Sequence, residues 1–166
     1  MGTPTNEITQ EQAALIRNAP LFFVSSVDPS LKQGPDGIGP VNLSPKGGTP
    51  LHILGPNRVA YLDYGGSGNE TARHAEKHGP ITLMVCSFEE DNAAIVKLYG
   101  HARAVPFEKS ELADLVRQGV GDEPSVRERQ VIEVDIDRTV TSCGYTIPVM
   151  NYVRERKKED WGRRYK

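Results

Sequence analysis

Short apolar segments separated by Pro- and Gly-containing turns recur along the chain, and this punctuation constrains the fold more than any other feature. The 166 residues include 12 Pro and 16 Gly. The segments between them are rich in β-branched and aromatic residues, which is typical of β-strands. Six or seven strands joined mostly by tight turns predict a mainly β protein, an antiparallel barrel with flanking helices. The strands are expected at residues 21–27, 40–44, 51–54, 58–63, 81–88, 94–105 and 131–142.

Sequence patterns typical of turns and helices predict the segments that connect the strands. Residues 45–48 predict a tight turn, after which residues 51–54 should return as the hairpin partner of residues 40–44. Thr9 and Gln12 have the spacing of a capping box at the start of a short N-terminal helix. Residues 110–118 predict an amphipathic helix.

A glycine-rich turn between a strand and a helix is the main functional signal. Three glycines lie in residues 65–68, and Ser67 and Glu70 have capping-box spacing at the expected helix start. Free backbone N–H groups at such a start, with Arg73 nearby, favour an anion such as phosphate. The same pattern also occurs in capped helices that hold no ligand, so both interpretations stay open.

Composition limits the other possibilities. The length predicts one domain over residues 1–166. Residues 151–166 hold seven Lys or Arg and three acidic residues, a net +4, which leaves −6 for residues 1–150 because the chain totals −2. This tail predicts a basic helix, solvated or docked, and nucleic-acid binding is not expected because the body is acidic. With no apolar run long enough for a membrane span, no signal-peptide pattern and two separated Cys, we expect a cytoplasmic protein.

Four segments carry a resemblance to a known family. They are Phe22-Phe-Val-Ser-Ser-Val27, Asn42-Leu-Ser-Pro-Lys-Gly47, Asp63-Tyr-Gly-Gly-Ser-Gly-Asn-Glu-Thr71 and Cys143-Gly-Tyr-Thr-Ile-Pro148. In this order they resemble the pyridoxamine 5′-phosphate oxidase-like family of FMN-binding split barrels, over about residues 10–161. The basic residues with which the vitamin-B6 enzyme binds pyridoxamine phosphate have no counterpart here.

The resemblance implies a homodimer with FMN in the cleft between subunits. Residues 42–46 would face the isoalloxazine edge, and the phosphate would lie near the strand–helix junction. Lys46 either supplies positive charge beside the flavin or is an exposed turn lysine, and Tyr145 either contacts the flavin or closes one barrel end. The implied cofactor-binding residues are Asn42, Ser44, Lys46, Tyr64, Ser67, Asn69, Thr71, Arg73 and Tyr145.

Two functions follow from these expectations. The first is an FMN-dependent oxidoreductase acting on a small molecule, in which the flavin carries hydride or electrons and no catalytic side chain is identified. The alternative is a protein that binds a flavin, a deazaflavin or another phosphate ligand without turnover, as a stress or sensory module. His74 and His78 have zinc-compatible spacing but no supporting ligand pattern, so no metal site is expected.

Overall fold

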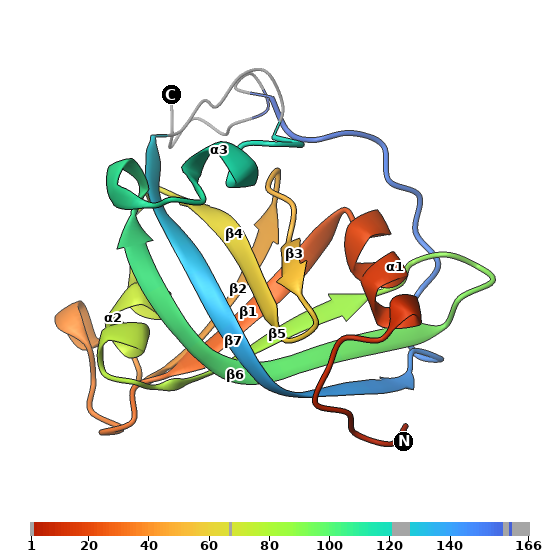
Figure 1. Cartoon of the computed structure of the whole chain (residues 1–166), viewed down its shortest axis with the longest axis horizontal. Coiled ribbons are helices and arrows are strands. Elements are labelled where there is room, and N and C mark those ends of the chain that lie inside the picture. Colours follow the sequence, from red (N-terminus) through yellow and green to blue (C-terminus); the bar gives the residue numbers. More distant parts are fainter. Residues whose placement is uncertain (1, 67, 121–126, 158–159, 161–166) are drawn as a thin grey trace.

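The computed structural model describes residues 2–66, 68–120, 127–157 and 160. In these ranges seven strands form one sheet that curls into a barrel, with helices at its ends (Figure 1). The α-helices are α1 (Gln10–Asn18), α2 (Glu70–Glu76) and α3 (Ala113–Val116), and the 3-10 helices are η1 (Pro35–Gly37) and η2 (Phe107–Lys109). The strands are β1 (Leu21–Val27), β2 (Val41–Gly47), β3 (His52–Gly55), β4 (Arg58–Tyr64), β5 (Pro80–Cys86), β6 (Ala94–Pro106) and β7 (Glu128–Cys143).

The sheet has the strand order β2-β1-β5-β6-β7-β4-β3, and every neighbouring pair is antiparallel. The long strand β6 pairs with β7 along its whole length, from Ala94 with Cys143 to Pro106 with Gln130. Strands β2 and β3 are the two edges, and within the described ranges no backbone ladder joins them. The barrel is therefore split between these edges. The prediction of a mainly β, six- to seven-stranded antiparallel split barrel is confirmed.

The hydrophobic core fills the barrel from the inner faces of the strands. β1 alternates half-buried and buried residues along its whole length, as a strand with one face on the core must. Val24, Leu83, Leu98 and Ile132 are completely buried, and Tyr61 lies among them with its ring edge against Phe22.

The N-terminal helix begins as its sequence predicts. Thr9 Oγ1 accepts a hydrogen bond from the Gln12 backbone N–H at 3.2 Å, and Gln12 Oε1 accepts one from the Thr9 N–H at 3.0 Å. This reciprocal pair confirms the capping box. The helix buries Leu15 and Ile16 and packs on β5 and β6. None of the described helices has the length and apolar character that a membrane crossing requires.

The predicted hairpin between residues 40–44 and 51–54 is wrong. β2 pairs with β1, whereas β3 pairs with β4. The predicted turn at residues 45–48 is also displaced, because β2 continues to Gly47 and the turn follows it. An edge strand tolerates Pro45, which has no N–H to donate. The chain after Gly48 then crosses the split instead of folding back.

The two C-terminal helix predictions need correction. The helix expected at residues 110–118 shortens to α3, and residues 151–157 form no helix. Pro148, Asn151 and Val153 are poor helix formers, which favours an extended chain here. The prediction of a basic helical tail is therefore wrong for residues 151–157. Its remainder, except residue 160, lies outside the described residues.

Candidate functional site

Strand β2 presents its predicted site residues on one face. Asn42, Ser44 and Lys46 are half-buried, whereas the alternate residues Val41 and Leu43 are 61% and 68% exposed. The two-residue period of a strand produces this division. The polar face of β2 is turned toward Asp63 of β4 and Thr71 of α2, as the contacts below show.

The start of α2 differs from the predicted capping box. The helix begins at Glu70 with Asn69 as its N-cap residue, two positions later than the Ser67 cap requires, and Ser67 itself lies outside the described residues. Asn69 makes no side-chain cap, because its Oδ1 accepts a hydrogen bond from Gln130 Nε2 at 2.8 Å. The Glu70 carboxylate is bound by Arg73, at 3.0 Å. The capping-box prediction is therefore wrong.

Thr71 connects this helix to β2. Its Oγ1 accepts a hydrogen bond from Asn42 Nδ2 at 3.2 Å, so two predicted site residues 29 positions apart meet. The Tyr61 hydroxyl is completely buried beside Thr71, but at no ordinary hydrogen-bond geometry within the described residues. Burial, and secondarily the negative charge of Asp63, raises the pKa of Tyr61 well above its ordinary value.

Asp63 accepts hydrogen bonds from two basic residues of the site, Lys46 and Arg129. Its side chain is 4% exposed, and Lys46 Nζ donates to Oδ1 at 2.8 Å. The other oxygen, Oδ2, accepts from Arg129 NH2 and from Gln130 Nε2, both at 2.8 Å. Burial alone would raise the pKa of Asp63, but Lys46, Arg129 and Gln130 outweigh it and hold this pKa below its ordinary value. Asp63 is thus a buried carboxylate with both oxygens in use.

A β-bulge lets Arg129 and Gln130 reach the same carboxylate. In the pairing of β4 with β7, Asp63 faces Gln130 and Tyr64 faces Glu128, so Arg129 is the additional residue. In a regular strand two successive side chains point to opposite faces, and only one could reach Asp63. The bulge removes this restriction. Its position at the start of β7 is therefore part of the site geometry.

Arg129 and Gln130 extend this cluster to the glycine turn. Arg129 NH1 donates to the Gly68 carbonyl oxygen at 2.8 Å, in addition to the Gln130 contact with Asn69. Arg129 Nε is buried with no acceptor in the described part of the chain. The two positive charges of Lys46 and Arg129 and the single negative charge of Asp63 leave a net charge of +1. The arrangement can bind an anion, because charged donors remain in a partly desolvated place.

Helix α2 is fixed to β1 by a second polar cluster. His74 is 4% exposed, and its Nδ1 lies 2.9 Å from Ser26 Oγ. Burial lowers the pKa of His74, because the desolvated ring is less readily protonated. One turn on, Lys77 donates to Asp28 Oδ2 at 2.6 Å. In the described ranges, no three His, Cys, Asp or Glu side chains are grouped so that they could hold a metal ion.

The two tyrosines of the predicted set lie apart from each other. Tyr64 follows Asp63 directly and is half-buried, and burial followed by the Glu128 charge raises its pKa. Tyr145 is 87% exposed in the turn after β7, where the Gly144 N–H donates to the Ala93 carbonyl oxygen. Within one chain, the structure therefore does not bring Tyr145 to the other predicted residues.

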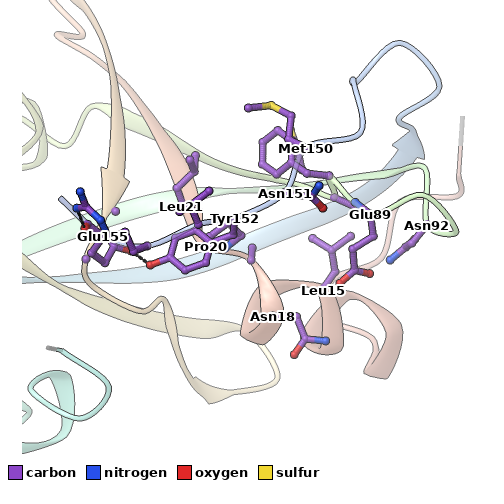
Figure 2. A pocket seen from close by; sticks show the side chains of 18 of the residues that line it. Leu15, Asn18, Pro20, Leu21, Glu89, Asn92, Met150, Asn151, Tyr152 and Glu155 are labelled. Carbon is purple, nitrogen blue, oxygen red and sulfur yellow. Dashed lines mark hydrogen bonds between the residues drawn. The ribbon is translucent and has the colours of Figure 1, made fainter.

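A wide groove of about 1960 Å³ runs between the body and the C-terminal segment. Figure 2 shows Leu15 and Asn18 of α1 on one side, with Met150, Asn151 and Tyr152 of the C-terminal segment across from them. Gly47 and Tyr64 also line this groove, and they directly follow Lys46 and Asp63 in sequence. Lys46, Asp63, Arg129 and Gln130 themselves do not line it.

Sequence comparisons identify relatives of this chain. The profile of the family described as "Pyridoxamine 5′-phosphate oxidase" matches residues 8–143. The pyridoxamine 5′-phosphate oxidase family protein ustO of Aspergillus flavus is 34% identical over 134 residues, which are 80% of this chain and 50% of that protein. The chain thus spans half the length of this curated relative.

Two solved structures show the same fold at low sequence identity. HupZ of Group A Streptococcus is 21% identical, with a TM-score of 0.58 over 81% of this chain and 99% of that one. An FMN-binding protein from Syntrophomonas wolfei is 11% identical, with a TM-score of 0.51 over 78% of this chain and 86% of that one.

Proposed function

The chain belongs to the pyridoxamine 5′-phosphate oxidase family, and from that premise we propose that it is a homodimeric, FMN-dependent oxidoreductase. One observation carries the proposal. Lys46 of β2 and Arg129 of β7 meet on Asp63 beside the glycine turn, with charged N–H donors still unused. Charged N–H donors of this kind form strong hydrogen bonds with a phosphate group.

The phosphate of FMN would lie between β2 and the start of α2. Lys46 and Arg129 would supply positive charge, and Asn69 and Thr71 would supply polar contacts, with Arg73 one turn further along α2. A Cβ added to Gly66 would meet no atom within 4 Å, so the turn leaves space for a ligand. Ser67 completes the proposed set, although it lies outside the described residues.

When bound, FMN would supply the transfer of hydride or electrons. The part of the chain is to bind and orient it. Asn42 and Ser44 share one face of β2 and would present polar groups to the edge of the flavin ring. Lys46, held 2.8 Å from Asp63, would lie further along the same face and offset the negative charge of the phosphate.

Exposed apolar side chains support a two-fold partner. Val41 and Leu43 project from the outer face of edge strand β2, and Tyr145 and Val153 are 87% and 86% exposed. An apolar edge strand of this kind is a site of association. In the proposed dimer these side chains are covered, and Tyr145 contacts the flavin bound mainly by the other subunit. The cytoplasmic location is part of the proposal.

The test is an absorbance spectrum of the purified protein, recorded before FMN is added and again after incubation and desalting. Flavin bands that survive desalting are expected. The Lys46→Met variant should lose them, whereas Lys109→Met should keep them because Lys109 is exposed on η2. A spectrum without flavin bands in both wild-type samples would contradict the proposal.

Reduction of the bound flavin distinguishes an oxidoreductase from a protein that binds flavin without turnover. Bleaching of the flavin bands by NADH or NADPH, and their return in air, would support an oxidoreductase. Stable binding without reduction would favour a flavin-binding module instead. The Syntrophomonas wolfei protein of the same fold, described as FMN-binding, makes that the second candidate.

A further inference from the structure

Asp63 is the most deeply buried charged residue of the candidate site. Its side chain is 4% exposed, compared with 22% for Lys46 and 27% for Arg129. A carboxylate beside a phosphate should repel it, so its presence among the phosphate-binding cations requires an explanation. Both of its oxygens accept hydrogen bonds from side chains of the same chain, and an ionised carboxylate has no proton to donate to a phosphate.

The contacts of Asp63 cross the split in the barrel. Lys46 lies on edge strand β2, and in the described part of the chain no backbone ladder connects β2 to β4. The 2.8 Å pair between Lys46 and Asp63 therefore fixes an ammonium group that the sheet itself does not position. Asn42 and Thr71 make a second, uncharged connection further along β2.

The same carboxylate is also connected to Gly68 and Asn69, at the end of the glycine turn. Arg129 uses NH2 for Asp63 and NH1 for the Gly68 carbonyl oxygen, and Gln130 Nε2 contacts both Asp63 and Asn69. Asp63 thus joins three separate parts of the site: β2, the bulged start of β7 and the turn before α2. Without it, two cations would face each other in a partly buried place and would move apart.

We propose that Asp63 is a positioning residue for the bound phosphate, which holds Lys46, Arg129 and the glycine turn in binding geometry. The proposal rests on the proposed FMN site. For the strength of phosphate binding, this role predicts the opposite of what net charge alone predicts. Removing the Asp63 charge makes the site more positive, yet phosphate binding becomes weaker because the donors lose their arrangement.

The test compares Asp63→Asn with wild type by titrating FMN and riboflavin and following flavin fluorescence. Riboflavin lacks the phosphate, so it reports on the ring alone. We expect the FMN dissociation constant to rise at least about tenfold, the strength of one hydrogen bond to a charged group. The riboflavin constant should change less than about twofold.

Glu133 provides a matched control. It is also a buried carboxylate on β7, 8% exposed, and it is bound by Arg58 and Arg103, away from the glycine turn. Glu133→Gln should lower thermal stability as Asp63→Asn does, but leave the FMN constant within about twofold of wild type. Equal weakening by both variants would make the Asp63 effect general destabilisation and overturn the proposal.

A second background tests whether Asp63 acts through Lys46. In the Lys46→Met variant the ammonium is absent, so adding Asp63→Asn should weaken FMN binding much less than it does in wild type. If Asp63→Asn alone does not fold, Gln130→Met removes the link from Asp63 to Asn69 without changing charge, and it should also weaken FMN binding.

The outcomes of these titrations distinguish a failure of the Asp63 positioning role from a failure of the proposed function. If wild type binds FMN and Asp63→Asn binds it equally or more tightly, the positioning role is wrong and the proposed function stands. If Asp63→Asn does not fold, unchanged FMN binding by Gln130→Met would likewise show that the positioning role is wrong. If wild type binds neither FMN nor riboflavin, the proposed function fails and the positioning role fails with it.

Discussion

Burial of His74 makes the stability of the folded chain depend on pH. His74 is 4% exposed and shares a hydrogen bond with Ser26, and burial lowers its pKa in the folded state. Of the surrounding charges, Asp28 and Glu70 favour the protonated ring and Arg73 disfavours it. When the pH falls through the ordinary histidine range, the unfolded chain takes up a proton that folded His74 refuses. Stability is therefore highest above the unfolded pKa and decreases on acidification.

The size of this effect follows from the unfolded pKa. With a value of about 6.5 in the unfolded chain and no proton uptake by folded His74, lowering the pH from 7.5 to 5.5 costs about 1.4 kcal/mol. This is an upper limit, which a folded pKa inside that window would reduce. The Asp28 carboxylate beside α2 stays ionised over this window, because its hydrogen bonds with Lys77 and Ser30 hold its pKa well below the usual range.

Urea unfolding at the two pH values measures the effect. His74 should account for up to about 1.4 kcal/mol of the fall in the wild-type free energy of unfolding. In His74→Gln, whose amide can still bond Ser26, most of that loss should disappear. His52 is half-buried and burial also lowers its pKa, so His52→Gln is measured in parallel to separate its share. Equal pH dependence in wild type and His74→Gln would refute the reasoning.

Three further perturbations test other parts of the account. Replacing Asn69 and Thr71 together with Ala should raise the FMN dissociation constant about a hundredfold or more, since two contacts to a charged group are lost; a double variant that purifies fully loaded would show that the phosphate lies elsewhere. Leu43→Lys on the outer face of β2 should shift the protein from dimer to monomer in sedimentation velocity, and an unchanged dimer would exclude this face from the interface. Gly100→Ala places a methyl group against a backbone carbonyl of β7 and should cost about 1–3 kcal/mol or more in urea unfolding. Gly55→Ala, with no atom within 4 Å of the added Cβ, should change stability by less than about 0.5 kcal/mol, and equal losses would contradict the packing argument.

Local periodicity predicted the strands but not all of their partners. β1 spans the residues predicted for it, and the Pro- and Gly-containing turns separate the strands as expected. The pairing of β2 was missed because neighbouring strands joined by a short turn usually form a hairpin. Here the barrel edge intervenes, and the connection after Gly48 crosses the split. Which two strands form the edges depends on the closure of the whole sheet, which no local pattern specifies.

Some residues of the candidate site could likewise be predicted from the sequence, and others could not. Asn42, Ser44 and Lys46 could be found from their alternation along one strand and from the family resemblance. Arg129 and Gln130 could not, because they reach Asp63 from more than 60 positions away through the register of β4 and β7. Their placement further requires a bulge, which the sequence before β7 does not mark. Asp63 itself was visible in the glycine-turn segment, but its contacts exist only in the folded chain.

The most direct test of the central claim is a side-by-side titration of the wild-type protein with FMN and with riboflavin. The two ligands share the ring and the ribityl chain and differ in the phosphate. If Lys46, Arg129 and the glycine turn bind that phosphate, FMN should bind about a hundredfold or more tightly than riboflavin, the value of two charged hydrogen bonds. Equal affinity for the two ligands would contradict a phosphate site at the split of the barrel.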